Sequence, residues 1–303
     1  MKILAPLRLR EFRLLWTGMT VSLVGDGVTL VAIAWQVYEL SNTPTALGIT
    51  MMAMSIPQLI LLLFGGAISD RFDRRRVMLG ADLIRGVALA VMGLLSLGGI
   101  LEIWHMAVIA ACYGAGSAFF GPAFDAVVPE LVPTEWLPQA NSLDQFVRPT
   151  AARLLGPALG GWIIASVGVG WAFIVDAATF AVSVACLIRL GRIGRQPGQS
   201  ESAEGLTLWA EIREGLLFVR SRAWLWGTFL AATLTYLVFL GPSEVLLPYI
   251  VKNELDGGAG DLGMVLAAGG IGAVVAALIM AQRGLPARNM TFIYIAWSLA
   301  TLM

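Results

Sequence analysis

The sequence predicts an all-α polytopic membrane protein, and three observations support this fold class. Hydrophobic residues make up 58% of the 303 residues, charged residues only 13%, and the mean hydropathy is +0.79. A soluble domain carries about 25% charged residues. Long apolar runs follow one another along the chain. A short and strongly basic loop at residues 65–78 separates two of these runs, and such loops lie on the cytoplasmic side of a membrane.

Eight apolar runs are each long enough to cross a membrane. A helix needs about 20 residues to span the hydrocarbon core, and hydrocarbon offers its backbone no other hydrogen-bond partner. Each run is therefore predicted to be a transmembrane helix: 12–38, 45–69, 77–100, 103–128, 143–167, 171–190, 224–248 and 261–281. A ninth run, 290–303, reaches Met303 before it is long enough to span.

These runs divide the chain into three predicted regions. Residues 1–190 form an N-terminal six-helix transmembrane bundle. Residues 191–222 form a cytoplasmic linker, which begins with a polar stretch rich in Gly, Ser and Glu. Its second part is a predicted amphipathic helix, because apolar side chains recur there at helical spacing: Leu208, Ile212, Leu216 and Val219. Residues 223–303 form a partial C-terminal bundle with helices 7, 8 and part of 9.

The basic residues predict the orientation of the chain. All but four of the 20 lysines and arginines fall on the side of the N-terminus; the exceptions are Arg85, Arg148, Arg153 and Lys252. By the positive-inside rule, the N-terminus is cytoplasmic and the protein is a multi-pass protein of the cytoplasmic (inner) membrane. A full-length span follows the basic start, so no cleaved signal peptide is expected.

A weak internal repeat bears on the length of the protein. Residues 46–48 and 261–263 open two predicted helices with similar sequences. Transporters often contain such repeats, and a matching second half would extend roughly a hundred residues beyond Met303. We therefore expect the chain to be incomplete or naturally truncated.

Several functional classes lack their sequence signals. No metal-ligand cluster, Walker sequence or nucleophile elbow is visible, so the sequence predicts neither an enzyme nor a metal, cofactor or nucleic-acid site. Residues 258–263 match G-x-G-x-x-G, but no strand precedes them. The two cysteines, Cys112 and Cys186, lie in apolar runs and do not indicate a disulfide framework.

Asp26 is the first candidate for a mechanistic role. It lies about 14 residues into the first predicted helix, roughly 21 Å along its axis. A carboxylate there costs about 2.5–3.5 kcal/mol unless it meets a partner or water. We expect Asp26 to couple transport to a proton or to substrate. The alternative is a carboxyl group that is kept neutral or hydrogen-bonded for packing.

Other polar residues inside the spans fall into pairs. Asp82 and Arg85 are three residues apart, and Asp144 and Arg148 four, which places each pair on one helix face. They are candidate intramembrane ion pairs, with interface anchoring as the alternative. Asp176 is expected near water at the outer end of helix 6. Aromatic residues such as Tyr113 are candidates to line an apolar substrate cavity, although most of them are expected to face lipid or the interface.

Two motifs resemble those of the major facilitator superfamily. The loop resembles its helix 2–3 motif, G-x-x-x-D-R-x-G-R-[KR], with these matching residues: Gly66, Asp70, Arg71, Arg74 and Arg75. Asp73 stands where the family usually has Gly. Helix 5 is similar to the G-P-x-x-G-G motif of the exporter branch, through Gly156, Pro157, Gly160 and Gly161. The resemblance implies a major-facilitator-type fold with a six-helix N-terminal bundle and an incomplete C-terminal bundle.

The resemblance also implies roles for both motifs. The loop would act as a cytoplasmic gate, in which Asp70 pairs with a neighbouring helix end or cation in one state and releases it in the other. Considered by themselves, its arginines are better explained as a cytoplasmic anchor. The helix 5 motif would allow close packing and bending during alternating access.

Residues 25–27 and 175–180 are similar to the branch that exports macrolides and siderophores of the enterobactin type. The resemblance therefore implies secondary active, proton-coupled export of a small amphipathic molecule (drug, macrolide or siderophore class) by alternating access. The implied partners are the lipid bilayer, the small-molecule substrate and protons, and the expected state is a monomer. Drug–proton antiporters usually carry an Arg in helix 4 where this chain has Ala110, so coupling through that Arg is not implied.

Two alternatives to export stay open. One is a facilitator or symporter of a small solute. The other is a transport-incompetent truncated fragment or a membrane scaffold, which would keep the fold without the activity.

Overall fold

The computed structural model describes residues 2–191, 208–283, 291, 292, 295 and 298, and its regular elements are helices. The first part contains a 3₁₀ segment (Lys2–Arg8) followed by α1 (Arg10–Leu40), α2 (Pro44–Arg71), α3 (Arg74–Leu97), α4 (Ile103–Leu131), a 3₁₀ turn (Thr134–Trp136), α5 (Leu137–Pro149), the π-helical segment η3 (Thr150–Leu155), α6 (Gly156–Val167) and α7 (Val169–Arg189). The second part contains α8 (Leu208–Ser221), α9 (Ala223–Thr235), the π-helical segment η4 (Tyr236–Leu240), α10 (Gly241–Asn253) and α11 (Ala259–Arg283).

Among the described residues, eight helical stretches are long and apolar enough to cross a membrane. They overlap the eight predicted runs, although the fifth begins at Thr134 and not at residue 143. The fifth, Thr134–Val167, joins α5, η3 and α6, and the seventh, Ala223–Asn253, joins α9, η4 and α10. The protein is therefore a multi-pass membrane protein. Most of the predicted ninth run and linker residues 192–207 lie outside the described residues, and α8 occupies the place of the predicted amphipathic helix.

Local sequence signals explain where several helices begin. Pro44 occupies the first turn of α2, where its missing N–H costs nothing. The Asp73 carboxylate caps α3 by accepting a hydrogen bond from the Arg76 backbone N–H at 3.2 Å. Asp73, which departs from the family pattern, thus provides an N-cap. Glu102 and His105 form a capping box at the start of α4, which gives the only histidine a structural role.

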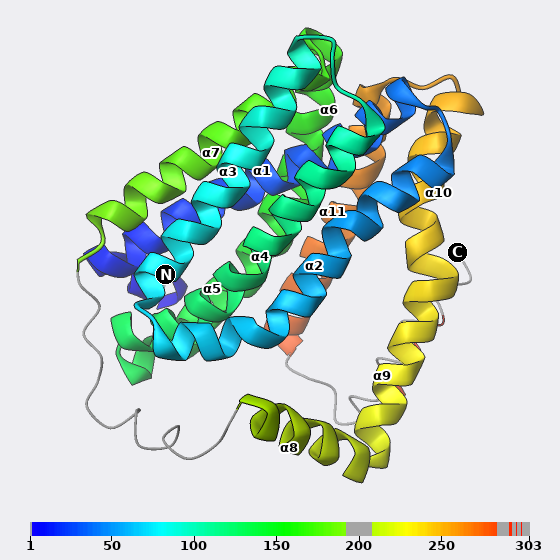
Figure 1. Ribbon diagram of the computed structural model, residues 1–303. Coiled ribbons are helices and arrows are strands. Elements are labelled where there is room, and N and C mark those ends of the chain that lie inside the picture. The colour runs from blue at the N-terminus through cyan, green and yellow to red at the C-terminus, as the bar shows by residue number, and fades with distance from the viewer. Residues whose placement is uncertain (1, 192–207, 284–290, 293–294, 296–297, 299–303) are drawn as a thin grey trace.

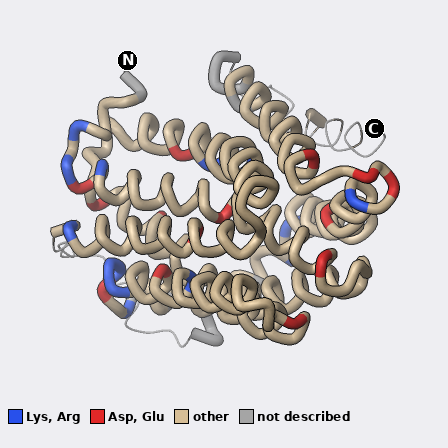
Figure 2. Tube along the Cα trace, turned by 90° about the horizontal axis from the view of Figure 1, so that it is seen from above, with Lys and Arg blue, Asp and Glu red and all other residues tan. Residues whose placement is uncertain are grey.

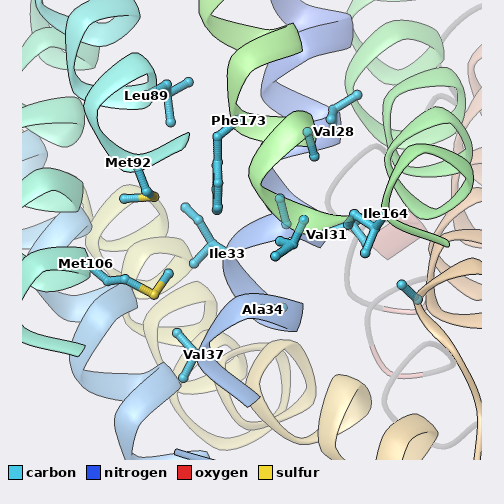
Figure 3. Packing of buried hydrophobic residues seen from close by; sticks show 14 of the residues in the cluster. Val28, Val31, Ile33, Ala34, Val37, Leu89, Met92, Met106, Ile164 and Phe173 are labelled. Atoms are coloured by element: carbon cyan, nitrogen blue, oxygen red, sulfur yellow. The ribbon is translucent and has the colours of Figure 1, made fainter. Parts of the chain in front are cut away.

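Helices α1, α3, α4 and α7 pack side by side and enclose most of the core, while α2 lies along α4 (Figure 1). One hydrophobic cluster is centred on the second half of α1 and joins α3, α4, α6 and α7; Figure 3 shows Ile33, Met92, Met106 and Phe173 within it. A second cluster lies near the start of α1 and includes Phe12, Met19, Met78 and Phe124.

The C-terminal helices meet this bundle unevenly. Helix α11 packs along α6 and η3, whereas α9 and η4 contain no buried residue and lie at the edge of the molecule (Figure 1). Most of the basic residues gather at one end of the helices (Figure 2), which we call the basic end. It is defined by the start of α1, the α2–α3 loop and the end of α7, with Arg10, Arg13, Arg75, Arg76 and Arg189.

Candidate functional site

A polar cluster lies between the two hydrophobic clusters. It joins side chains of four helices that are far apart in sequence: Asp26 from α1, Asp82 and Arg85 from α3, Tyr113 from α4 and Asp176 from α7. Phe180 belongs to one hydrophobic cluster and Phe120 to the other, and both rings border the polar side chains. Charged groups in such a position are rare and are usually functional.

Arg85 lies at the centre of the cluster, and its side chain is only 6% exposed. It forms an ion pair with Asp82, whose side chain is 0% exposed and also accepts a hydrogen bond from the Ser183 hydroxyl at 2.6 Å. The guanidinium carbon lies 4.8 Å from the centre of the Phe120 ring and 4.5 Å from that of Phe180. Both aromatic faces favour the cation there. The structure thus places the two residues of the predicted Asp82–Arg85 pair in direct contact.

Asp26 is the carboxyl group of this cluster that reaches the surface, because its side chain is 24% exposed. One oxygen, Oδ1, accepts a hydrogen bond from the Tyr113 hydroxyl. The other, Oδ2, lies 4.0 Å from Nη1 of Arg85. Asp26 therefore contacts both the surroundings of the bundle and the enclosed Asp82–Arg85 pair. Only Asp26, Asp82 and Arg85 of this cluster were nominated from sequence.

Tyr113 and Asp176 were missed. Asp176 is 0% exposed, so the expected position of its carboxyl near water is wrong, and Tyr113, which is only 8% exposed, is not among the aromatic residues that face lipid. The Thr29 hydroxyl donates to Asp176 Oδ2 at 2.6 Å, and the Thr179 hydroxyl lies 2.8 Å from Oδ1. Gly25 lets α1 approach, since a Cβ there would lie 2.8 Å from Asp176 Cγ. The spacing of Asp176, Thr179 and Ser183 along one face of α7 was the available signal.

The loop motif ties α3 to two neighbouring helix ends. Arg74 forms an ion pair with Glu130 and donates to the Ala126 carbonyl at 2.9 Å, near the end of α4. Arg75 donates to the carbonyls of Leu187 and Ile188 at 2.6 and 2.5 Å, at the end of α7. A cation there complements the helix dipole. Gly66 and Arg71 lie in the last turns of α2, while the side chain of Asp70 lies outside the described part of the chain.

The helix 5 motif, residues 156–161, lies in α6 and packs against helices on two sides. A Cβ at Gly156 would lie 2.6 Å from Gly27 Cα, and one at Gly160 would lie 3.0 Å from Val28 Cα, both in α1. On the other side, a Cβ at Gly161 would lie 2.9 Å from Gly263 Cα in α11. These glycines bring α6 into backbone contact with both α1 and α11.

Two spans each contain a π-helical segment that is followed directly by a Gly-Pro pair. In the fifth span, the π-helical segment Thr150–Leu155 directly precedes Gly156 and Pro157; in the seventh, Tyr236–Leu240 directly precedes Gly241 and Pro242. Proline removes a backbone donor and crowds the carbonyl four residues earlier, which opens the helix locally. Single π-helical turns often occur at functional sites.

Contacts between α1 and α10 close the end of the bundle opposite the basic end. The Tyr38 hydroxyl donates to the Val245 carbonyl at 2.6 Å, and Lys252 Nζ donates to the Tyr38 carbonyl. The Asn42 side-chain amide donates to Asn253 Oδ1 at 2.8 Å. These contacts hold the C-terminal helices against the N-terminal ones at that end.

Asp144 and Arg148 lie apart from the buried cluster. Arg148 Nε donates to Asp144 Oδ2 at 2.7 Å. The Arg148 side chain is 40% exposed and that of Asp144 is 21% exposed. Asp125 lies 3.9 Å from Arg148. This pair is therefore partly exposed on α5. In the described part of the chain, no group of three or more His, Cys, Asp or Glu side chains is arranged to hold a metal ion.

Comparison with known proteins identifies the family. Residues 1–296 match the transmembrane secretion effector family. The chain is 27% identical to the uncharacterized MFS-type transporter YfiS of Bacillus subtilis over 89% of its length, 25% identical to macrolide efflux protein A of Streptococcus pyogenes over 82%, and 32% identical to the multidrug efflux pump Tap of Mycolicibacterium fortuitum over 90%. It spans 63%, 60% and 66% of these relatives. The chain belongs to the transmembrane secretion effector family of major facilitator transporters, which are efflux-type membrane transporters and not enzymes.

Proposed function

We propose that this protein is a secondary active exporter of small amphipathic molecules of the drug, macrolide or siderophore class, and that protons drive it through Asp26. The names of two relatives, a macrolide efflux protein and a multidrug efflux pump, support the substrate class. The observation that carries the proposal is the position of Asp26. It is the partly exposed carboxyl of an otherwise enclosed polar cluster, and it lies within 4.0 Å of the buried cation Arg85.

The two charge states of Asp26 would have different effects on Arg85. When Asp26 is ionised, it competes with Asp82 for the guanidinium. When Asp26 takes up a proton, Arg85 forms an ion pair with Asp82 only. A ligand or proton can shift a conformational equilibrium only through such a difference between two states. Because Asp26 lies on α1 and Arg85 on α3, the exchange links proton binding to the relative position of these helices.

Alternating access then requires contacts that form and break at the two ends. With the N-terminus in the cytoplasm, the α1–α10 contacts close the outer side, and α6 and α11 slide or bend against each other through their glycines. The π-helical segments before Gly156 and Gly241 support bending at these levels. We assign the loop motif to a cytoplasmic gate, in which Arg74 and Arg75 hold a fixed rim and Asp70 is the switching group. We further propose that the protein works as a monomer in the cytoplasmic membrane.

The test is transport by inside-out membrane vesicles that contain the chain, with erythromycin and ethidium as probes. We expect probe accumulation when a proton gradient is imposed, and loss of that accumulation in Asp26→Asn. Asp256→Asn is the matched control: Asp256 is exposed in a loop at φ 49°, a conformation that Asn tolerates well, so accumulation is retained. Gradient-driven accumulation that is unchanged in Asp26→Asn would reject Asp26 as the coupling group.

The same vesicles separate export from the two alternatives. A facilitator equilibrates the probes but does not concentrate them, with or without a gradient. A symporter concentrates them only when the gradient has the opposite sign. A membrane scaffold leaves the probe distribution equal to that of vesicles without the protein.

A further inference from the structure

Asp176 is a second carboxyl group in the cluster, and nothing in the proposed role of Asp26 uses it. Its side chain is 0% exposed, enclosed between α7 and α1. The charged and titratable groups around it are Asp26 on α1, Arg85 on α3 and Tyr113 on α4. No cation lies within ion-pair distance of Asp176 among the described residues. Arg85, the cation of the cluster, is already paired with Asp82.

The oxygens of Asp176 are contacted by neutral hydroxyl groups. The Thr179 hydroxyl oxygen lies 2.7 Å from the backbone carbonyl oxygen of Asp176 and 2.8 Å from its Oδ1. A hydroxyl group has one hydrogen to donate, and a carbonyl oxygen can only accept. The Thr179 hydroxyl can donate to either of these oxygens, and the Thr29 hydroxyl donates to Oδ2, so these hydroxyl groups offer Asp176 neutral donors and no countercharge.

The charge balance of the cluster favours a protonated Asp176. Three carboxyl groups, those of Asp26, Asp82 and Asp176, share one guanidinium among the described residues. Asp82 and Arg85 neutralise each other. Asp26 accepts a hydrogen bond from the Tyr113 hydroxyl and lies 4.0 Å from Nη1 of Arg85, and both contacts stabilise its charge. Asp176 is 0% exposed and has no cation within ion-pair distance in the described part of the chain, and an enclosed carboxyl in this situation binds a proton rather than remaining ionised.

We propose that Asp176 is a second proton-binding site of this protein, occupied in the conformation described here. Gly25, which directly precedes Asp26 in the sequence, allows the Asp176 carboxyl to lie close to α1, and Thr29 of α1 donates a hydrogen bond to it. Export would then move protons through a pair of carboxyls, with Asp26 exchanging with the surroundings and Asp176 holding a proton inside. This role in export rests on the proposed function, whereas the bound proton itself does not.

The test is the infrared spectrum of the purified chain in detergent near neutral pH, which needs no transport substrate. A protonated carboxylic acid has a carbonyl stretch that a carboxylate lacks. We expect Asp176→Asn to lose one such acid band relative to the unmodified protein. Asp256→Asn is the matched control: it removes an exposed carboxyl outside the cluster, at a φ of 49° that Asn tolerates well, and leaves the acid band unchanged.

A second pair of variants covers the case in which Asp176→Asn does not fold. Thr179→Val removes the hydroxyl partner of Oδ1, so we expect the acid band to shift to higher frequency because the carboxyl loses a hydrogen bond. Thr179→Ser keeps the hydroxyl and should leave the band in place. The proposal is overturned if the unmodified protein shows no acid band that depends on Asp176 or Thr179, or if Asp176→Asn removes only a carboxylate band. Neither result would affect proton coupling through Asp26, which the vesicle assay tests separately.

Discussion

The Tyr113 hydroxyl donates a hydrogen bond to the Asp26 carboxylate, which joins α4 to α1 in the middle of the N-terminal helices. The ring is 8% exposed, while the Asp26 side chain is 24% exposed. The same carboxylate lies 4.0 Å from Arg85 on α3. One partly exposed group therefore touches two neighbouring helices, so a change in its charge alters contacts with both.

Removing the hydroxyl tests this link. Tyr113→Phe deletes the donor to Asp26 and keeps the ring, so we expect a loss of about 1–3 kcal/mol in the free energy of unfolding, since the hydrogen bond is to a charged group. The measurement is thermal unfolding of the purified protein. Tyr236→Phe is the control, because Tyr236 is 58% exposed on η4. Equal unfolding midpoints for the two variants would contradict the role of the Tyr113–Asp26 bond.

The Asp82–Arg85 pair predicts strongly non-additive stabilities. Arg85→Met leaves Asp82 enclosed without its cation, and Asp82→Asn leaves Arg85 with Asp26 alone, so each single variant is expected to lose about 3–5 kcal/mol. The double variant removes both charges and should lose less than the sum of the two. A double-mutant cycle by chemical denaturation measures the difference.

A surface pair provides the comparison for this cycle. Arg10 and Glu11 lie 3.3 Å apart, with side chains 69% and 36% exposed, and Arg10→Ala should cost no more than about 1 kcal/mol. Additive losses at Asp82 and Arg85 would mean that the two residues do not act as a pair.

The α6–α11 interface is expected to tolerate no added methyl group at Gly161. A Cβ there would lie 2.7 Å from the Ala259 carbonyl oxygen and 2.9 Å from Gly263 Cα, so backbone must move. Gly161→Ala should lower the free energy of unfolding by about 1–3 kcal/mol and reduce export. Gly48→Ala in α2 has open space around its Cβ and should be neutral or slightly stabilising. If both variants unfold at the same temperature, α6 and α11 are not packed as described.

Locking the α1–α10 end should arrest the transport cycle. Asn42 and Asn253 meet at 2.8 Å, so cysteines at both positions can be joined by a short bifunctional thiol reagent after Cys112 and Cys186 are replaced by Ser. We expect export to fall with the fraction of cross-linked protein, whereas each single-cysteine variant keeps its activity after the same treatment. Undiminished export by the cross-linked protein would show that this end need not open.

Hydropathy located the membrane spans correctly because the requirement is local. Each span must satisfy its backbone internally and present apolar side chains, and both properties are visible in a run such as 45–69. The two motifs likewise identified the family, because the residues of each motif stand at fixed spacings within a single segment. Arg75 belongs to the loop motif, and Gly161 to the motif at residues 156–161. The N-cap role of Asp73 is also local, although it became clear only with the start of α3 at Arg74.

Asp176 and Tyr113 show where prediction from sequence failed. A carboxyl less than two turns inside the end of a helix is near water only if no neighbouring helix covers it, and here α1 covers Asp176 through Gly25 and Thr29. Tyr113 has the amphipathic ring typical of a membrane interface, but its hydroxyl donates a hydrogen bond to Asp26 inside the bundle. Both outcomes depend on contacts between residues that are far apart in the sequence. Asp26 and Tyr113 are separated by 87 positions, and Thr29 and Asp176 by 147.

The sequence by itself determined the membrane spans, the family and the chemical types of the candidate residues, because these depend on composition and on spacing within single helices. Only the tertiary structure decided which polar groups meet. The partnership of Asp26 with Tyr113 and Arg85, and the enclosure of Asp176, depend on how α1, α3, α4 and α7 are rotated and how closely they approach. That packing is set by small residues and by side-chain contacts across helices, which no single segment encodes.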